Sequence, residues 1–257
     1  MIPMDGGWAT PGVEDFQFPN GLFGISWLTK PMVQLILSVI LVLVVWLVAA
    51  KRLKVRPTKG QFFMEFVYDF VRNSIAREMI GPGYQRWVPL LTGMFSIIII
   101  NNWFGEFLLL MFPTFSNVGY VYGMTIFVYL LYIAAGFQAH GPGYLKKALV
   151  PPGVPPYMLP IIVPMEFIST FLTRPLTLSV RLFANMFAGH LVVLVFVGGG
   201  TYLLTYAGSW FNNTAGALSW VMAMVMMALE VFIGFLQAYI FTMLTAQYIS
   251  SAVSEEH

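Results

Sequence analysis

The feature that most constrains this chain is a run of twenty residues, 31–50, without a single charged side chain. At about 1.5 Å per residue, a helix of that length spans about 30 Å, the thickness of the hydrocarbon core of a bilayer. Charged residues make up only 9% of the 257 residues, whereas they make up about 25% of an average soluble domain. The chain is therefore expected to be a polytopic membrane protein, and an ordinary soluble enzyme is excluded.

Further apolar segments predict four more transmembrane helices, which would cover residues 87–112, 117–139, 160–197 and 217–250. The last two are longer than a perpendicular helix needs. They are expected to be either kinked, with Pro164 and Pro175 as candidate sites in the first, or strongly tilted. We favour a tilted antiparallel hairpin. Between the first two spans, residues 61–80 combine charged residues with one apolar stripe at a helical period, which predicts an interfacial amphipathic helix.

The basic residues predict the orientation. Five of the nine residues in 51–59 are basic, and Lys146 and Lys147 follow the third predicted span. Because basic loops mark the cytoplasmic side, segment 1–30 is expected outside, whereas the amphipathic helix, the loop 140–159 and the C-terminus are expected on the cytoplasmic face. The expected fold is a single all-α membrane domain over the whole chain, residues 1–257.

Several functions are excluded or disfavoured by what the sequence lacks. The chain has no cysteine, so disulfides, thiol nucleophiles and cysteine-based metal sites are ruled out. It contains no P-loop and no dinucleotide-binding glycine motif. A net charge of +2 predicts no general attraction to nucleic acid. We therefore expect a non-catalytic membrane protein without a cofactor or a bound metal.

Polar side chains within the apolar segments are the candidate functional residues, because an ionisable group in mid-membrane costs at least a few kcal/mol unless it faces a cavity or a partner. The candidates in the last two segments are Glu166, Arg174, Arg181, Asn185, His190, Glu230 and Gln237. Glu106 lies in the second segment.

Helix geometry separates these candidates by depth and face. Arg181 and Gln237 are expected near the midplane, whereas His190 and Glu230 are expected in the outer half. Arg181 and His190, nine residues apart, point to opposite sides of their helix. Histidine and a buried glutamate exchange protons near neutral pH, while a permanently charged arginine blocks protons and attracts a carboxylate. The layout favours proton conduction.

Other interpretations of these side chains stay open. Arg174 could extend its charge to the nearby interface, and Glu166 is better explained as an interfacial charge than as a proton relay. His190 and Glu230 could form a purely structural pair between helices. The sequence leaves the role of Glu106 undecided.

The segment from Arg174 to His190, RPLTLSVRLFANMFAGH, resembles the characteristic motif of subunit a of F-type ATP synthases. FLQAYIFTMLTAQYIS, residues 235–250, is similar to the last helix of that family. The resemblance is specific over residues 160–257 and looser over the first 150. It implies a proton-conducting stator subunit with two offset half-channels, beside a ring of c subunits and in contact with peripheral-stalk b subunits and lipid. The bacterial plasma membrane is the expected location, and an organelle-encoded chain is the alternative.

The resemblance also implies roles for single residues. Arg181 would face the essential carboxylate of the ring, with Asn185 and Gln237 close to it. His190 and Glu230 would line the outer half-channel; some bacterial members carry these two residue types exchanged, which suggests that the side chains meet. Further candidate half-channel residues are Asn102, Glu106, Glu166, Arg174 and Thr177.

Two other classes of function remain as alternatives. A secondary transporter or ion channel could use the same buried charges for a small solute, although we find no internal repeat of the kind that such transporters contain. A purely structural membrane anchor is disfavoured by the mid-span Arg181.

Overall fold

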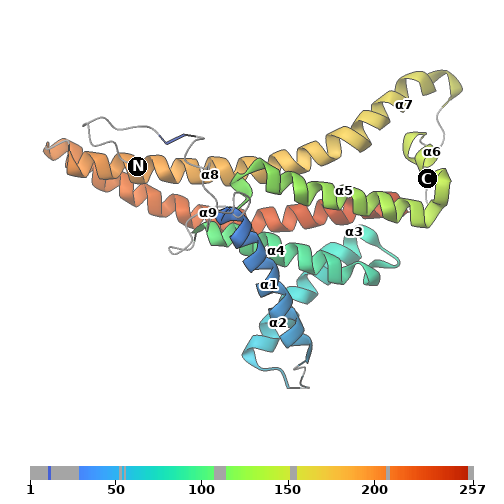
Figure 1. Cartoon of the computed structure of the whole chain (residues 1–257), viewed down its shortest axis with the longest axis horizontal. Helices are drawn as coiled ribbons and strands as arrows, with labels where there is room; N and C mark the ends of the chain where they lie inside the picture. The colour runs from blue at the N-terminus through green and yellow to red at the C-terminus, as the bar shows by residue number, and fades with distance from the viewer. Residues whose placement is uncertain are drawn as a thin grey trace. The chain divides into compact units, whose positions relative to one another are not determined.

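The computed structural model describes residues 11–12, 29–51, 54, 56–106, 114–150, 155–206 and 209–253. Within these ranges all regular structure is helical, so the predicted all-α class is confirmed (Figure 1). The chain divides into two compact units. Unit 1 comprises residues 1–38, 99–118 and 183–237, and unit 2 comprises residues 39–98, 119–182 and 238–257.

Five helices are long and apolar enough to cross a membrane, as the sequence predicted. They are α1 (Lys30–Lys51), α4 (Val88–Glu106), α5 (Val118–His140), the combined segment Leu159–Thr205 and α9 (Trp210–Val253). The combined segment consists of α7 (Leu159–Phe167), a π-helical section η8 (Ile168–Thr173) and α8 (Arg174–Thr205). The end of the second predicted span, 107–112, lies outside the described residues. The orientation of the termini stays a prediction.

The last two helices are longer than expected. α8 continues to Thr205 rather than ending at residue 197, and α9 begins at Trp210 rather than at residue 217. The reason is close packing of glycines: a Cβ built on Gly200 would lie 3.1 Å from the backbone oxygen of Gly216. Because neither residue carries a side chain, the two helices approach closely at this point.

Within unit 1, α8 and α9 form the predicted antiparallel hairpin. The hydroxyl of Ser219 donates to the backbone oxygen of Phe196 at 2.8 Å, and the contact of Gly200 with Gly216 lies farther along α8 and nearer the start of α9. As the residue number of the contact increases along α8, the residue number of its partner on α9 decreases, which is the pattern of two antiparallel helices. Their tilt in a membrane stays a prediction.

The predicted amphipathic helix is present as three consecutive helical sections, α2 (Lys59–Phe70), the π-helical η3 (Val71–Arg77) and α3 (Glu78–Ile80). Thr58 caps the start, since its hydroxyl accepts from the backbone N–H of Gln61. Gly81 ends it with a φ of +71°, a backbone conformation that favours glycine. Phe62, Phe63 and Phe66 are more than half exposed, as expected of a helix whose apolar face meets lipid.

The described residues of the connection between the third and fourth spans, 141–150 and 155–158, form short helical pieces. These are two single 3₁₀ turns, η6 (Gly141–Gly143) and η7 (Pro156–Met158), and one short helix, α6 (Tyr144–Leu149). Tyr144 is buried because its ring packs directly on Gly136 of α5, where any Cβ would collide with it. This contact folds the start of the connection back onto α5 within unit 2.

Candidate functional site

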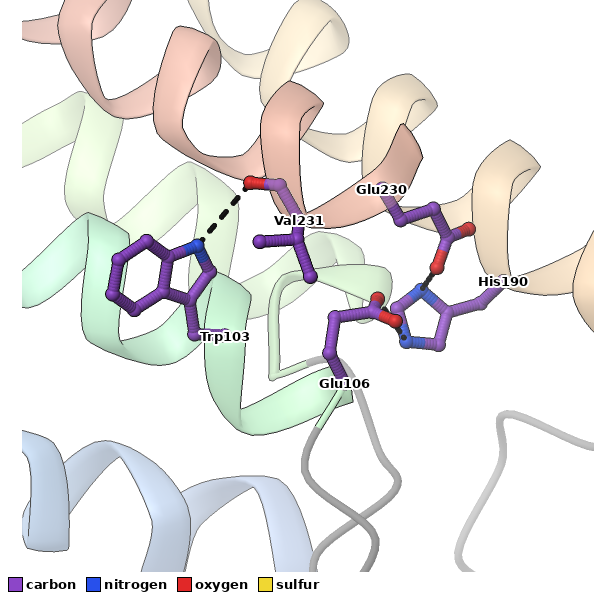
Figure 2. A network of polar contacts seen from close by, with 5 residues as sticks. All are labelled: Trp103, Glu106, His190, Glu230 and Val231. Atoms are coloured by element: carbon purple, nitrogen blue, oxygen red, sulfur yellow. Dashed lines mark hydrogen bonds and ion pairs between the residues drawn. The ribbon is translucent and has the colours of Figure 1, made fainter. Parts of the chain in front are cut away.

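Three ionisable side chains from three helices meet in unit 1. Nε2 of His190 on α8 lies 3.4 Å from Oε1 of Glu106 at the end of α4, and Nδ1 of the same ring lies 3.4 Å from Oε2 of Glu230 on α9. Figure 2 shows the imidazole between the two carboxylates. The predicted contact of His190 with Glu230 is confirmed. We call Glu106, His190 and Glu230 the carboxylate–histidine cluster.

The cluster is largely removed from solvent. The side chains of His190, Glu106 and Glu230 are 12%, 9% and 8% exposed. The helical segments that build it, 99–106, 183–206 and 209–237, contain no lysine and no arginine. Because an isolated buried charge is very unfavourable, the imidazole of His190 is well placed to pair with the two buried carboxylates.

The end of α4 is held against α9 by side chains next to Glu106. Nδ2 of Asn102 donates to the backbone oxygen of Gly234 at 2.9 Å, and Nε1 of Trp103 donates to that of Val231 at 3.3 Å (Figure 2). Gly234 permits this approach, because a Cβ there would lie 3.2 Å from Cβ of Asn102. Asn102 therefore acts as a structural link between the two helices, and through it Glu106 reaches the cluster.

Gly189 makes room for the carboxylate of Glu230. A Cβ on Gly189 would collide with Oε1 of Glu230 and lie 3.2 Å from its Cγ. The residue directly before His190 is thus required to be small so that the glutamate can approach the imidazole. The sequence alone does not distinguish this glycine from the other 22.

A second polar contact joins the same two helices. Nδ2 of Asn185 donates to Oε1 of Gln237 at 2.8 Å, and Gln237 is 1% exposed while Asn185 is exposed. This pair lies farther from the α8–α9 turn than the carboxylate–histidine cluster does, on the path toward the other end of the hairpin. The two amides can pass hydrogen bonds to water but do not change charge.

Arg181, Thr177 and Arg174 belong to the part of α8 that lies in unit 2. Arg181 and Thr177 are exposed and one helical turn apart, and Arg181 forms no ion pair with the described residues of its own unit. The Thr177 hydroxyl donates to the backbone oxygens of Thr173 and Arg174. The Arg174 guanidinium lies 5.4 Å from the ring centroid of Tyr248, which is a cation–π contact.

Glu166, by contrast, is half-buried on α7 in unit 2 and belongs neither to the carboxylate–histidine cluster nor to the Asn185–Gln237 pair. Glu106 is the residue whose place the sequence left undecided. Locally, the sequence shows only that Glu106 lies one helical turn after Asn102. The packing of α4 against the hairpin depends on contacts between residues far apart in the chain.

The chemistry open to the cluster is proton exchange or cation binding. Imidazole and carboxylate groups at 3.4 Å need only a small movement to form hydrogen bonds and transfer a proton. One ligand atom from each of the three residues also lies within 4.8 Å of the others, and zinc accepts imidazole and carboxylate ligands. The expected absence of a bound metal stays a prediction.

Comparison with known proteins gives a consistent result. Residues 32–250 match a family model described as ATP synthase A chain. A protein of a Nocardioides species named ATP synthase subunit a is 43% identical and is aligned over 98% of this chain and 95% of its own length. Proteins of the same name from Pseudarthrobacter chlorophenolicus and Streptomyces lividans are 41% and 35% identical, over 96% and 98% of this chain and 94% and 90% of their own.

Proposed function

The chain belongs to the ATP synthase subunit a family, and from this premise we propose that it conducts protons through two offset half-channels that load and unload the carboxylates of a rotating c ring. Membership of the family supports a proton-translocating stator role in the membrane sector. Neither a solute transporter nor a structural anchor is proposed. The single observation that carries the detailed mechanism is the carboxylate–histidine cluster, in which His190 contacts both glutamates.

In this mechanism the cluster is the outer entrance. A proton arriving from outside passes to His190 or to one of the carboxylates, and these groups lie close enough to exchange it. Asn185 and Gln237 continue the polar surface along the hairpin toward the ring.

Arg181 separates the two half-channels. A permanent cation repels protons and attracts an ionised carboxylate of the ring, so that the carboxylate loses its proton before it passes. Arg181 is exposed and forms no ion pair with the described residues of its unit, which supports this role. Each proton that crosses 100 mV carries about 2.3 kcal/mol, which a direct leak between the half-channels would dissipate. Thr177 and Arg174 would border the inner half-channel, and Glu166 would lie near its mouth.

The ring of c subunits, the b subunits of the peripheral stalk and the surrounding lipid are the proposed partners, and the bacterial plasma membrane is the proposed location. The five apolar helices support a multi-pass protein. Arg181 supports the ring as a partner, because a mid-span arginine is costly unless another group supplies a negative charge.

The experiment that tests this function replaces Arg181 in the assembled complex. Arg181→Ala should abolish ATP-driven proton pumping into inverted membrane vesicles while passive proton flow through the membrane sector is retained. Arg77→Ala is the matched control, because Arg77 is an exposed arginine on the amphipathic helix and should leave pumping unchanged. Pumping that survives in Arg181→Ala would overturn the proposal.

A further inference from the structure

The fourth span is interrupted shortly before Arg181. Between α7 and α8, residues Ile168–Thr173 form the π-helical section η8. The backbone N–H of Arg174 donates to the oxygen of Ser169, five residues earlier, instead of to the residue four earlier as in an α-helix. Such sections are rare and usually consist of one turn that contains one extra residue.

The π-helical section leaves the carbonyl of Thr170 without a donor from its own helix. In a π-helix this oxygen would accept from residue 175, but that residue is Pro175, which has no N–H. The N–H of Arg174, which would serve it in an α-helix, is bonded to Ser169. Thr170 is 4% exposed, so water does not readily replace the missing donor.

Tyr132 of α5 supplies the donor. Its hydroxyl donates to the backbone oxygen of Thr170 at 3.0 Å, and the side chain of Tyr132 is 1% exposed. A second side chain also supports the section, since the hydroxyl of Thr173 donates to the backbone oxygen of Ile168 at 3.2 Å. If residues 168–175 formed a regular α-helix, the carbonyl without a donor would be that of Phe171 instead, and the hydroxyl of Tyr132 would face the wrong group.

The ring of Tyr132 is itself fixed in unit 2. It lies 5.4 Å from the ring of Tyr129 and 5.9 Å from that of Tyr248, measured between centroids. The ring of Tyr248 in turn carries the guanidinium of Arg174, the first residue of α8. The hydroxyl of Tyr132 is therefore presented to Thr170 from a rigid aromatic group.

The extra residue determines which face α8 presents. Each residue of an α-helix adds a rotation of about 100° and a rise of about 1.5 Å, so loss of the π-helical turn would rotate and shift everything that follows by about these amounts. At present Leu178 and Ser179 are buried, whereas Thr177 and Arg181 are exposed. A rotation of this size would turn Arg181 away from the face that it now occupies.

We propose that Tyr132 is a positioning residue for proton transfer: its hydrogen bond to the Thr170 carbonyl keeps the π-helical section in place and thereby sets the rotation of α8 that presents Arg181. The proposal rests on the proposed function of Arg181. It concerns a residue on a different helix, 49 positions away in the sequence, that contacts neither a proton carrier nor the arginine itself.

The first test is Tyr132→Phe in the full complex, which keeps the ring and removes only the hydroxyl. Loss of one buried hydrogen bond shifts the balance between the π-helical and α-helical forms by about three- to tenfold. We expect ATP-driven proton pumping per ATP hydrolysed to fall severalfold, with the amount of assembled complex unchanged. Tyr129→Phe is the matched control, because it removes a hydroxyl one turn earlier on the same helix. Equal pumping in the two variants would overturn the proposal.

The second test separates positioning from general stability. Deletion of the exposed Ser169 removes the extra residue, so that a regular α-helix keeps the present rotation of α8 without the help of Tyr132. The deletion should retain pumping, and adding Tyr132→Phe to it should cause no further loss. A defect of Tyr132→Phe that persists at full size in the deletion background would contradict the proposal.

If the complex that carries the deletion does not assemble, Thr173→Val takes its place as the second test. This variant removes the other side-chain donor to the π-helical section and should lower pumping, as Tyr132→Phe does. Normal pumping in Thr173→Val together with normal pumping in Tyr132→Phe would reject the proposal. The proposed function of Arg181 is tested separately: normal pumping in Arg181→Ala would contradict it, whatever the result for Tyr132.

Discussion

His190 is the residue on which the outer part of the proposed path depends, because its two ring nitrogens face two different carboxylates. The contact of His190 with Glu230 is predicted from the family resemblance, because some members carry the two residue types exchanged. The resemblance also makes Glu106 a candidate half-channel residue, but no local pattern shows that it meets His190. A proton that enters at one carboxylate can therefore leave at the other through the imidazole.

At the same scale, Gly189 is predicted to control the position of Glu230. Gly189→Ala should displace this carboxylate and lower the rate of proton flow by one to about two orders of magnitude, since small misplacements of reacting groups have effects of that size. Passive proton flow into vesicles that contain the membrane sector measures the change. Gly123→Ala is the control, because a Cβ there meets nothing within 4 Å. Equal rates in the two variants would show that Glu230 does not need this space.

At the scale of secondary-structure elements, the hairpin of α8 and α9 depends on residues without side chains. The sequence predicts two long antiparallel helices from hydropathy and charge, and the first predicted span ends at residue 197, directly before three consecutive glycines. The structure instead uses Gly200 and Gly216 to bring two backbones into contact. A glycine in a membrane helix favours close helix packing more than it breaks the helix, because neighbouring lipid offers the backbone no alternative partner.

This packing predicts that a larger side chain in α9 is destabilising at Gly216 but not at the neighbouring exposed position. Gly216→Val would place a side chain against the backbone oxygen of Gly200 and the side chain of Leu204, and overpacking of this kind costs about 1–3 kcal/mol. The free energy of unfolding of the purified chain, measured by denaturant titration in detergent, should fall by that amount. Ala217→Val adds the same branched side chain at the neighbouring exposed position and should have little effect. Equal losses in both variants would argue that the β-branched residue type, rather than the glycine contact, is responsible.

At the scale of the whole molecule, the five apolar helices follow from the composition of the chain, and their orientation toward the two sides of the membrane is predicted from its basic residues. All ten of the lysines and arginines between residues 51 and 147 fall on segments assigned to the cytoplasmic face. The helical segments that build the carboxylate–histidine cluster, 99–106, 183–206 and 209–237, contain no lysine and no arginine. The basic residues that predict the orientation therefore lie outside these segments.

The orientation is directly testable, because the chain contains no cysteine of its own. Gly60→Cys, at the start of the amphipathic helix, should react with a membrane-impermeant maleimide only in inverted vesicles. Asn117→Cys, before α5, should react only in right-side-out vesicles. The unmodified chain is the control and should not be labelled. Reaction of both variants from the same side would mean that α4 does not cross the membrane.

By itself the sequence determined the number of spans, the amphipathic helix and the short set of polar side chains inside the membrane. It could do so because hydropathy, charge and helical period are properties of adjacent residues. Only the tertiary structure decided that Glu106 joins His190 and Glu230, that Gly189 makes space for a carboxylate, and that Tyr132 meets the Thr170 carbonyl. These contacts join residues from 38 to more than 120 positions apart, and their geometry arises only when the helices pack.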